Sequence, residues 1–357
     1  MHYDRRAFLR LALRAAGAGM AVPLLAACST PSAPAPTATS AGAAANQAAP
    51  AQATSITRVS YAYATPNGLH FVATVGSEKP ELPHKFGIEF DLLTTTNSPN
   101  AVNALVGGSV NTAAATPDSA WPALEKATDI KQLWPVANGT PYVLLSQPEL
   151  KKVSDLKGKT IGVSALVGGA DTTAVKIMST ENGLSANDFT LVQAGAIADR
   201  TVAMQAKSID ACANLEPQAS LLRDAGFPEI DTADNYPPLK GVHSIVIMAK
   251  QSWYQGSGEV PANFLRAWDS ITKWIYDPAN KDELLAISRK AMGGTDAGVL
   301  QVYKLHVEAM SVPQNLKMNE KMLQQFADNL RKAGIENVPS DPMKYVDTSL
   351  VSQTLNV

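Results

Sequence analysis

From Ile56 onwards the chain alternates between strand-like and helix-like stretches, and the alternation occurs as two sets. The expected strands of the first set are 57–64, 88–94 and 110–115, with a helix at 99–106. Those of the second set are 160–164, 190–193 and 209–213, with helices at 170–181 and 198–206 between them. Strands separated by helices predict right-handed crossovers and largely parallel sheets. The chain is therefore predicted to be α/β, with two βαβ-type lobes.

The two sets look like copies of one unit. Residues 107–114 (GGSVNTAA) and 206–213 (AKSIDACA) share a helix end, a tight turn and a strand of small residues. Two further strands, 142–146 and 242–249, are expected to pass between the lobes as hinges. We therefore assign residues 56–143 and 242–357 to lobe I, and residues 144–241 to lobe II.

The residues from about Pro261 to Leu330 are expected to be mostly helical and to pack on lobe I. Four apolar residues recur there at helical spacing, which predicts a core face. They are Trp268, Ile271, Trp274 and Ile275.

The first 27 residues resemble a twin-arginine export signal. Arg5 and Arg6 precede an apolar stretch, and small residues stand just before Cys28. That stretch is too short and too weakly apolar to hold a bilayer alone, since about 20 strongly apolar residues are needed. The sequence Leu25-Ala26-Ala27-Cys28 is similar to a bacterial lipoprotein box, which predicts that Cys28 carries the lipid. We expect a protein anchored to the cell membrane and facing the extracytoplasmic side.

Residues 28–55 are expected to link the lipid to the folded part. From Ser29 to Ser55 the chain has no charge and no aromatic side chain. Such a composition cannot bury enough surface to offset the entropy of ordering, so this Ala/Pro/Ser/Thr-rich stretch is predicted to be a disordered tether. As a flexible coil it would span roughly 30 Å.

Charge and cysteine content exclude several classes of protein. Removal of residues 1–27 would leave 26 basic and 31 acidic residues, without the basic stripe that nucleic-acid binding needs. Cys212 would be the one cysteine besides Cys28, so no disulfide is expected. The five histidines show no metal-ligand spacing, and we expect neither a metal nor a cofactor.

Several motifs resemble, in order, those of one transport family. They are residues 152–163 (KVSDLKGKTIGV), 182–184 (NGL) and 207–211 (KSIDA) in lobe II, and 107–112 (GGSVNT) in lobe I. The family is that of the solute-binding proteins of ABC importers for alkanesulfonates, taurine, nitrate, thiamine-pyrimidine precursors and riboflavin. The resemblance implies a two-lobed type II periplasmic-binding-protein fold in a monomer that serves ABC permease and ATPase subunits. One segment departs from the family pattern: residues 70–86 carry Pro80 and Pro83 in place of a charged helix.

Ligands of open α/β sheets bind beyond the carboxyl ends of the strands, which selects the candidate ligand-binding residues. They are Tyr63, Thr65, Asn67, Asn97, Thr116, Asp118, Tyr142, Ser164, Gly169, Asn214 and Glu216. Several have a structural alternative. Thr116 followed by proline is also typical of a helix start, Asn67-Gly68 of a plain turn, and Glu216 of an exposed acid in a first helical turn.

The candidate residues favour a neutral, planar solute. Glu216 could accept a hydrogen bond from a ring N–H or an exocyclic amine, and nearby aromatic residues such as Tyr63 and Tyr142 could stack on a ring. Of the six arginines after residue 27, only Arg200 lies near a candidate loop, whereas tightly bound anions usually need arginine. We expect riboflavin or a thiamine-pyrimidine precursor, with taurine, an alkanesulfonate or nitrate as the alternative.

An enzyme is the main alternative from another class, because one branch of the wider family makes the thiamine pyrimidine. That branch uses a cysteine-rich iron-site motif, which this sequence lacks, and no Ser/His/Asp order is present. A scaffolding lipoprotein without a ligand is a third possibility. We therefore expect a binding protein and not an enzyme.

A Cys28→Ser variant tests the anchor. It should bind the same solute as the parent but leave the membrane fraction, because the acceptor thiol of the lipid is gone. Fractionation of cells followed by immunoblotting measures this. Retention of the variant in the membrane fraction would contradict the assignment of Cys28.

Overall fold

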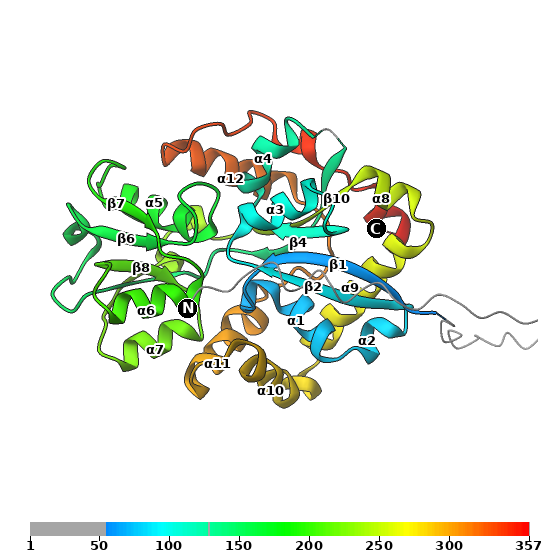
Figure 1. The fold of residues 1–357 in the computed structure, drawn as a ribbon, viewed down its shortest axis with the longest axis horizontal. Helices are drawn as coiled ribbons and strands as arrows, with labels where there is room; N and C mark the ends of the chain where they lie inside the picture. The colour runs from blue at the N-terminus through cyan, green and yellow to red at the C-terminus, as the bar shows by residue number, and fades with distance from the viewer. Residues whose placement is uncertain (1–54, 128, 357) are drawn as a thin grey trace, which may run out of the picture. The chain divides into compact units, whose positions relative to one another are not determined.

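The computed structural model describes residues 55–127 and 129–356 (Figure 1). The export signal, Cys28 and the tether up to residue 54 lie outside the described residues, so the expectations about them stay predictions. The elements described below all belong to the unit Pro50–Val357. In the described ranges, no helix combines the length and the apolar character needed to cross a bilayer.

The first of two five-stranded sheets has the order β2-β1-β3-β10-β4. β1 runs parallel to β2 and β3, whereas β10 runs antiparallel to β3 and β4. The strand bounds are β1 Thr57–Ala64, β2 Ile88–Thr95, β3 Thr112–Ala115, β4 Ile130–Asn138 and β10 His243–Lys250. We call the part built on this sheet lobe I.

The second sheet has the order β7-β6-β8-β5-β9, and the part built on it is lobe II. β6 runs parallel to β7 and β8, whereas β5 runs antiparallel to β8 and β9. The strand bounds are β5 Val143–Ser146, β6 Thr160–Val163, β7 Thr190–Gln193, β8 Ala211–Asn214 and β9 Glu229–Thr232. Each sheet thus places three parallel strands beside an antiparallel pair, which confirms the predicted α/β class with two similar units.

The expected hinge strands need a correction. β5 lies wholly in the second sheet and β10 wholly in the first, because each is paired with strands of that sheet alone. The chain crosses between the sheets in the segments that precede them, residues 139–142 and 233–242. Each crossing is followed at once by the antiparallel strand of the sheet that it enters.

Helices pack on both sheets. In lobe I, α3 packs against β1 and β3, and in lobe II, α5 and α6 pack against β8. The helices of the first half are α1 Phe71–Glu78, α2 Glu81–His84, α3 Ser98–Val106, α4 Pro117–Leu124, α5 Ala170–Glu181, α6 Ile197–Gln205 and α7 Gln218–Asp224. Those of the second half are α8 Gln251–Gly256, α9 Val260–Tyr276, α10 Lys281–Met292, α11 Asp296–Tyr303, α12 Glu320–Lys332 and α13 Ser349–Leu355.

The sequence pattern predicts most of these elements but misses β4 and β9. β4 is buried along almost its whole length, so its residues show no alternation that would mark a strand. β9 is a four-residue edge strand with two acidic residues, which strand propensity disfavours. Both missed strands complete the antiparallel side of their sheet.

The core face predicted on α9 is confirmed. Trp268, Ile271 and Ile275 are buried, and Trp274 packs at the edge of the same core. The Trp268 ring lies 5.9 Å from that of Phe264 and 6.2 Å from that of Trp134. Aromatic pairs at such distances add to the stabilisation that burial provides. This cluster fixes the C-terminal helices on lobe I.

The opening helix of lobe I is interrupted, in keeping with its two prolines. α1 ends at Glu78, and the separate turn α2 follows Pro80. A proline supplies no backbone N–H and restricts the residue before it, so the helix cannot continue through this point. Both pieces pack against α9, and the interruption lies on the side of lobe I that faces away from lobe II (Figure 1).

Three histidines are buried in uncharged form. Burial lowers the pKa of His306 to about 3 and that of His243 to about 4. Burial, with a smaller contribution from His306, lowers the pKa of His70 to about 3. His243 accepts a hydrogen bond at Nε2 from the Asn319 N–H (2.8 Å), so its Nδ1–H donates to Asn138 Oδ1 (2.8 Å). Protonation of His243 would break the first of these bonds.

Stability should therefore fall on acidification. Each of these pKa values lies below the ordinary value near 6.5, so the unfolded chain binds more protons and stability is lost as the pH falls below that value. At pH 5 the loss should reach about 2 kcal/mol per histidine. Urea unfolding at pH 7.5, 6 and 5 measures it, and His243→Gln should reduce the pH slope by about a third. If the unfolding free energy of the variant fell with pH as steeply as that of the parent, His243 would not contribute to the acid sensitivity.

Candidate functional site

A small polar cavity lies between the two lobes, at the carboxyl ends of their central strands. Its volume is about 30 Å³, enough for no more than a few water molecules. It is lined from lobe I by the loops after β1 and β2, and from lobe II by the loop after β6 and by α6. Five of the predicted ligand-binding residues line this cleft cavity: Thr65, Asn67, Asn97, Tyr142 and Ser164.

Asn67 shapes the loop after β1. Its Oδ1 accepts a hydrogen bond from the Leu69 N–H (2.8 Å), and its Nδ2 donates to the Thr65 carbonyl oxygen (2.7 Å). The side chain thereby caps the short helix Gly68–His70. Asn67 is therefore both the turn residue that its sequence indicates and part of the cavity wall.

Asn97 joins the lobes at the cavity. As the N-cap of α3, it accepts a hydrogen bond from the Asn100 N–H at Oδ1 (2.9 Å). Its Nδ2 donates across the cleft to the Ser164 carbonyl oxygen (3.0 Å). Both hydrogen-bonding ends of this amide are occupied by protein groups.

A buried ion pair organises the wall from lobe II. Arg200 Nη1 lies 3.1 Å from Asp171 Oδ2, and both side chains are 1% exposed. Asp171 also accepts hydrogen bonds from the Ser164 N–H (2.6 Å) and hydroxyl (2.7 Å). Arg200 donates to the carbonyl oxygens of Ala213 and Gly195. The guanidinium charge at the cavity is therefore balanced by a carboxylate.

His70 is a cavity residue that the sequence analysis missed. It lines the cleft cavity, is 1% exposed, and its Nδ1 has no hydrogen-bond partner in the described part of the chain. A buried ring nitrogen without a partner is costly, so it is available to a ligand. The sequence signal was its place three residues after Asn67, in the same loop.

The two candidate tyrosines differ in position. Tyr142, in the first crossing segment, lines the cavity, and burial together with the Asp171 charge raises the pKa of its hydroxyl. Tyr63 does not line the cavity. Its ring packs edge-on against His70 at 5.1 Å and is tilted against the Tyr61 ring at 5.5 Å. Tyr63 thus supports the His70 ring from the core side.

Thr116, Asp118 and Gly169 lie outside the cavity lining. Thr116 Oγ1 donates to the Gly168 carbonyl oxygen (3.1 Å), and Asp118 Oδ2 accepts a hydrogen bond from Thr173 Oγ1 (3.3 Å). Gly169 is the N-cap of α5, where a Cβ would stand 2.7 Å from Asp171 Oδ1. The first two residues pair with groups of the opposite lobe.

Asn214 and Glu216 are not brought to the cleft cavity. Asn214, at the end of β8, is buried and donates to Thr201 Oγ1 (3.1 Å). Glu216 forms an ion pair with Arg223 and accepts a hydrogen bond from the Ser220 N–H (3.2 Å). Its carboxylate is therefore satisfied by its own lobe, and we no longer place it against the solute.

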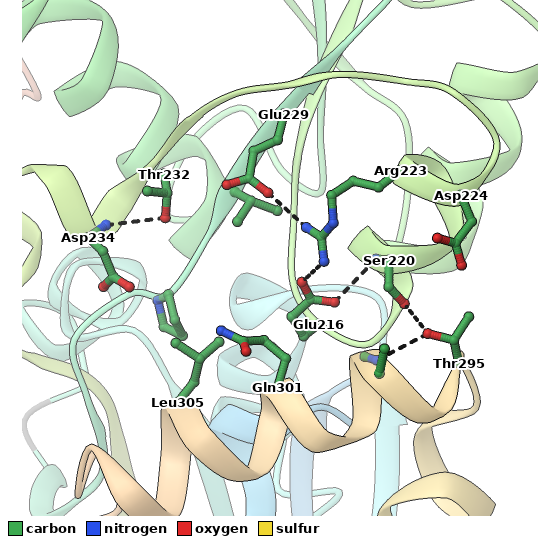
Figure 2. A pocket seen from close by; sticks show the side chains of 14 residues that line it. Glu216, Ser220, Arg223, Asp224, Glu229, Thr232, Asp234, Thr295, Gln301 and Leu305 are labelled. Atoms are coloured by element: carbon green, nitrogen blue, oxygen red, sulfur yellow. Dashed lines mark hydrogen bonds and ion pairs between the residues drawn. The ribbon is translucent and has the colours of Figure 1, made fainter.

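Figure 2 shows the separate cavity in which Glu216 lies. This cavity of about 460 Å³ is lined by α7 and β9 of lobe II and by α11. Ser220 and Thr295 meet across it at 2.9 Å between hydroxyl oxygens. The Glu216 carboxylate points to the Arg223 guanidinium, which also binds Glu229.

The described residues contain no cluster of side chains suited to a metal ion. In residues 55–127 and 129–356, no group of three or more His, Cys, Asp or Glu side chains is placed to bind one. Cys212 is buried in β8, and burial raises the pKa of its thiol to about 12. A thiol with such a pKa is a poor nucleophile and a poor metal ligand.

Replacement of Arg200 with methionine tests the buried pair. The variant leaves the Asp171 carboxylate buried without its cation, which should cost about 3 kcal/mol of unfolding free energy. Arg331→Met is the control, since Arg331 forms an exposed pair with Asp328 and should lose at most about 1 kcal/mol. Chemical unfolding measures both, and equal losses would contradict a structural role for the Arg200–Asp171 pair.

Comparison with known proteins places the chain in a family. The family model described as NMT1/THI5 like matches residues 84–281, more than half of the chain. No curated protein matches the sequence. Many solved structures share the fold, all of those considered below at less than 25% identity.

Two similar structures are ligand-binding proteins. The alkanesulfonate-binding protein SsuA from Xanthomonas axonopodis pv. citri, bound to MOPS, has a TM-score of 0.67 and 17% identity, over 83% of this chain and 100% of that one. The ligand-binding component of an ABC-type import system from Staphylococcus aureus, with zinc bound, has a TM-score of 0.68 and 14% identity, over 83% and 98%.

An enzyme also shares the fold. The desulfurization enzyme DszB has a TM-score of 0.58 and 13% identity, over 84% of this chain and 99% of that one. Likeness at these identities shows the fold alone, whereas the family model covers both lobes. The chain therefore belongs to the NMT1/THI5-like family and has the two-lobed periplasmic-binding-protein fold.

Proposed function

We propose that this protein is the extracytoplasmic solute-binding lipoprotein of an ABC importer. It captures a small solute between its lobes and delivers it to the permease, which the ATPase subunits drive. The cleft cavity supports the proposal, because polar groups from both lobes and from the first crossing converge there. Binding proteins of this architecture work by hinge closure around a ligand.

The volume of the cavity indicates that the lobes must part to admit a solute. Ligand pockets generally measure about 300–1,000 Å³, some ten times the present cavity. The crossings at residues 139–142 and 233–242 are the segments that such a motion would bend. The arrangement described above is thus a closed form of the two lobes.

The solute that we propose is neutral and planar, such as riboflavin or a thiamine-pyrimidine precursor. The cavity has no unbalanced charge, since Asp171 neutralises Arg200 and the His70 ring is uncharged at neutral pH. The rings of His70 and Tyr142 line it. An uncharged ring nitrogen and two aromatic faces suit a hydrogen-bonding heterocycle.

Taurine, an alkanesulfonate or nitrate is the second candidate. The first residue of α5, Ala170, lines the cavity, and no side chain caps this helix. The N-terminus of a helix favours an anion through its free N–H groups and its dipole. The SsuA structure bound to MOPS is consistent with this alternative.

A binding role is favoured over an enzymatic one, although DszB shares the fold. The described part of the chain has one thiol, Cys212, which is fully buried in a strand and protonated at neutral pH. None of the residues around the cavity combines an exposed nucleophile with a general base within hydrogen-bonding distance. Turnover of a bound solute by the purified protein would overturn the binding role.

The location that we propose comes from the N-terminal sequence. The paired arginines and Cys28 support export, lipidation and a place on the outer face of the cell membrane. An uncharged, flexible tether would hold the lobes at a root-mean-square distance of about 30 Å from the anchor. Such a receptor stays close to the permease that it supplies.

A thermal-shift panel combined with mass spectrometry of co-purified molecules tests the solute. Riboflavin or a thiamine-pyrimidine precursor should raise the melting temperature. His70→Phe should lower the affinity about tenfold through the lost hydrogen bond, whereas Glu216→Gln, a control outside the cleft cavity, should leave it unchanged. Stabilisation by taurine or nitrate alone would refute the vitamin assignment. A lower affinity of Glu216→Gln for the solute would indicate that this carboxylate contacts it.

A further inference from the structure

Three of the hydrogen bonds between the lobes lie at the cleft. Asn97 Nδ2 donates to the Ser164 carbonyl oxygen at the cavity wall. The other two, Thr116 to Gly168 and Thr173 to Asp118, involve residues that do not line the cavity. Lobe I supplies the donor in two of these bonds and lobe II in the third, so each lobe contributes both donors and acceptors.

The loop before α5 is shaped for this contact. Gly168 has a φ of 71°, which favours glycine over other residues. A Cβ at this position would lie 2.9 Å from Ser119 Cα, so the loop backbone comes directly against the start of α4. The carbonyl of Gly168 faces the Thr116 hydroxyl at 3.1 Å as a result. A side chain at residue 168 would push the lobes apart.

The two threonine hydroxyls of this contact are paired across the cleft, whereas Asp118 Oδ1 has no partner in the described part of the chain. Thr116 is 1% exposed and Thr173 is 2% exposed, so their hydroxyls need partners when the lobes meet. The opposite lobe supplies both partners. The contact therefore joins the lobes through residues that do not line the cavity.

We propose that Thr116 and Asp118 of lobe I, with Gly168 and Thr173 of lobe II, form a latch that holds the lobes closed in the absence of solute. The latch deepens the proposed function, because solute binds only the fraction of molecules in which the latch is open. A receptor whose binding-competent form is a minor population shows a reduced apparent affinity. The latch thus sets the apparent affinity of the receptor for its solute.

Distances between the lobes in the solute-free protein test the latch. Spin labels would be placed at the exposed positions Asn103 on α3 and Ala186 after α5, in the full-length chain with Cys28→Ser. The buried Cys212 is shielded from labelling. Pulsed electron paramagnetic resonance then gives the closed and open populations without any ligand.

The parent should be mainly in the short-distance, closed form. Thr116→Val and Thr173→Val each remove one hydroxyl and should lower the closed-to-open ratio about fivefold, the effect of one hydrogen bond. Thr116→Ser and Thr173→Ser keep the hydroxyl and should match the parent. A parent that is fully open, or serine variants that open as far as the valine variants, would overturn the latch. Because no solute is present, this result is independent of the proposed transport function.

Discussion

The Arg200–Asp171 ion pair is the interaction on which the lobe II side of the site depends. Through its two partners it ties together the loop after β6, the start of α5, the end of β8 and the loop after β7. A buried charge is tolerated only when it is paired and hydrogen-bonded, and here both charges are. The pair fixes the wall and at the same time removes net charge from it.

The charge balance at the cleft cavity is the structural basis for proposing a neutral solute. An arginine near the cleft first suggests an anion receptor, but this guanidinium already has a carboxylate partner and two carbonyl partners. The residues that line the cavity include His70, whose imidazole is uncharged, Tyr142 and the first residue of α5. The proposed latch uses residues that do not line the cavity. We therefore propose that solute binding and lobe closure depend on different residues of one cleft.

The sequence predicted the site unevenly, for a physical reason. Thr65, Asn67, Asn97 and Ser164 line the cavity because the carboxyl ends of parallel strands face a common edge, and Tyr142 reaches it from the first crossing. Their contact with a solute stays a prediction. Glu216 obeys the same rule but turns to Arg223, seven residues along the chain, and a pairing on the next helix is not visible in strand order. His70 was considered only as a metal ligand, although its loop was already selected. Thr116 and Asp118 reach the other lobe instead of the cavity.

By itself the sequence determined the α/β class, the duplication, most strands and helices, and the core face of α9, since these follow from local periodicity and burial. It also predicts export and lipidation, through Arg5, Arg6 and Cys28. Tertiary structure alone decided that β5 and β10 belong to one sheet each, that β4 and β9 complete them, and which polar groups face the cavity. Those features depend on pairings between residues far apart in the chain, such as Asn97 with Ser164, and no local pattern encodes such pairings.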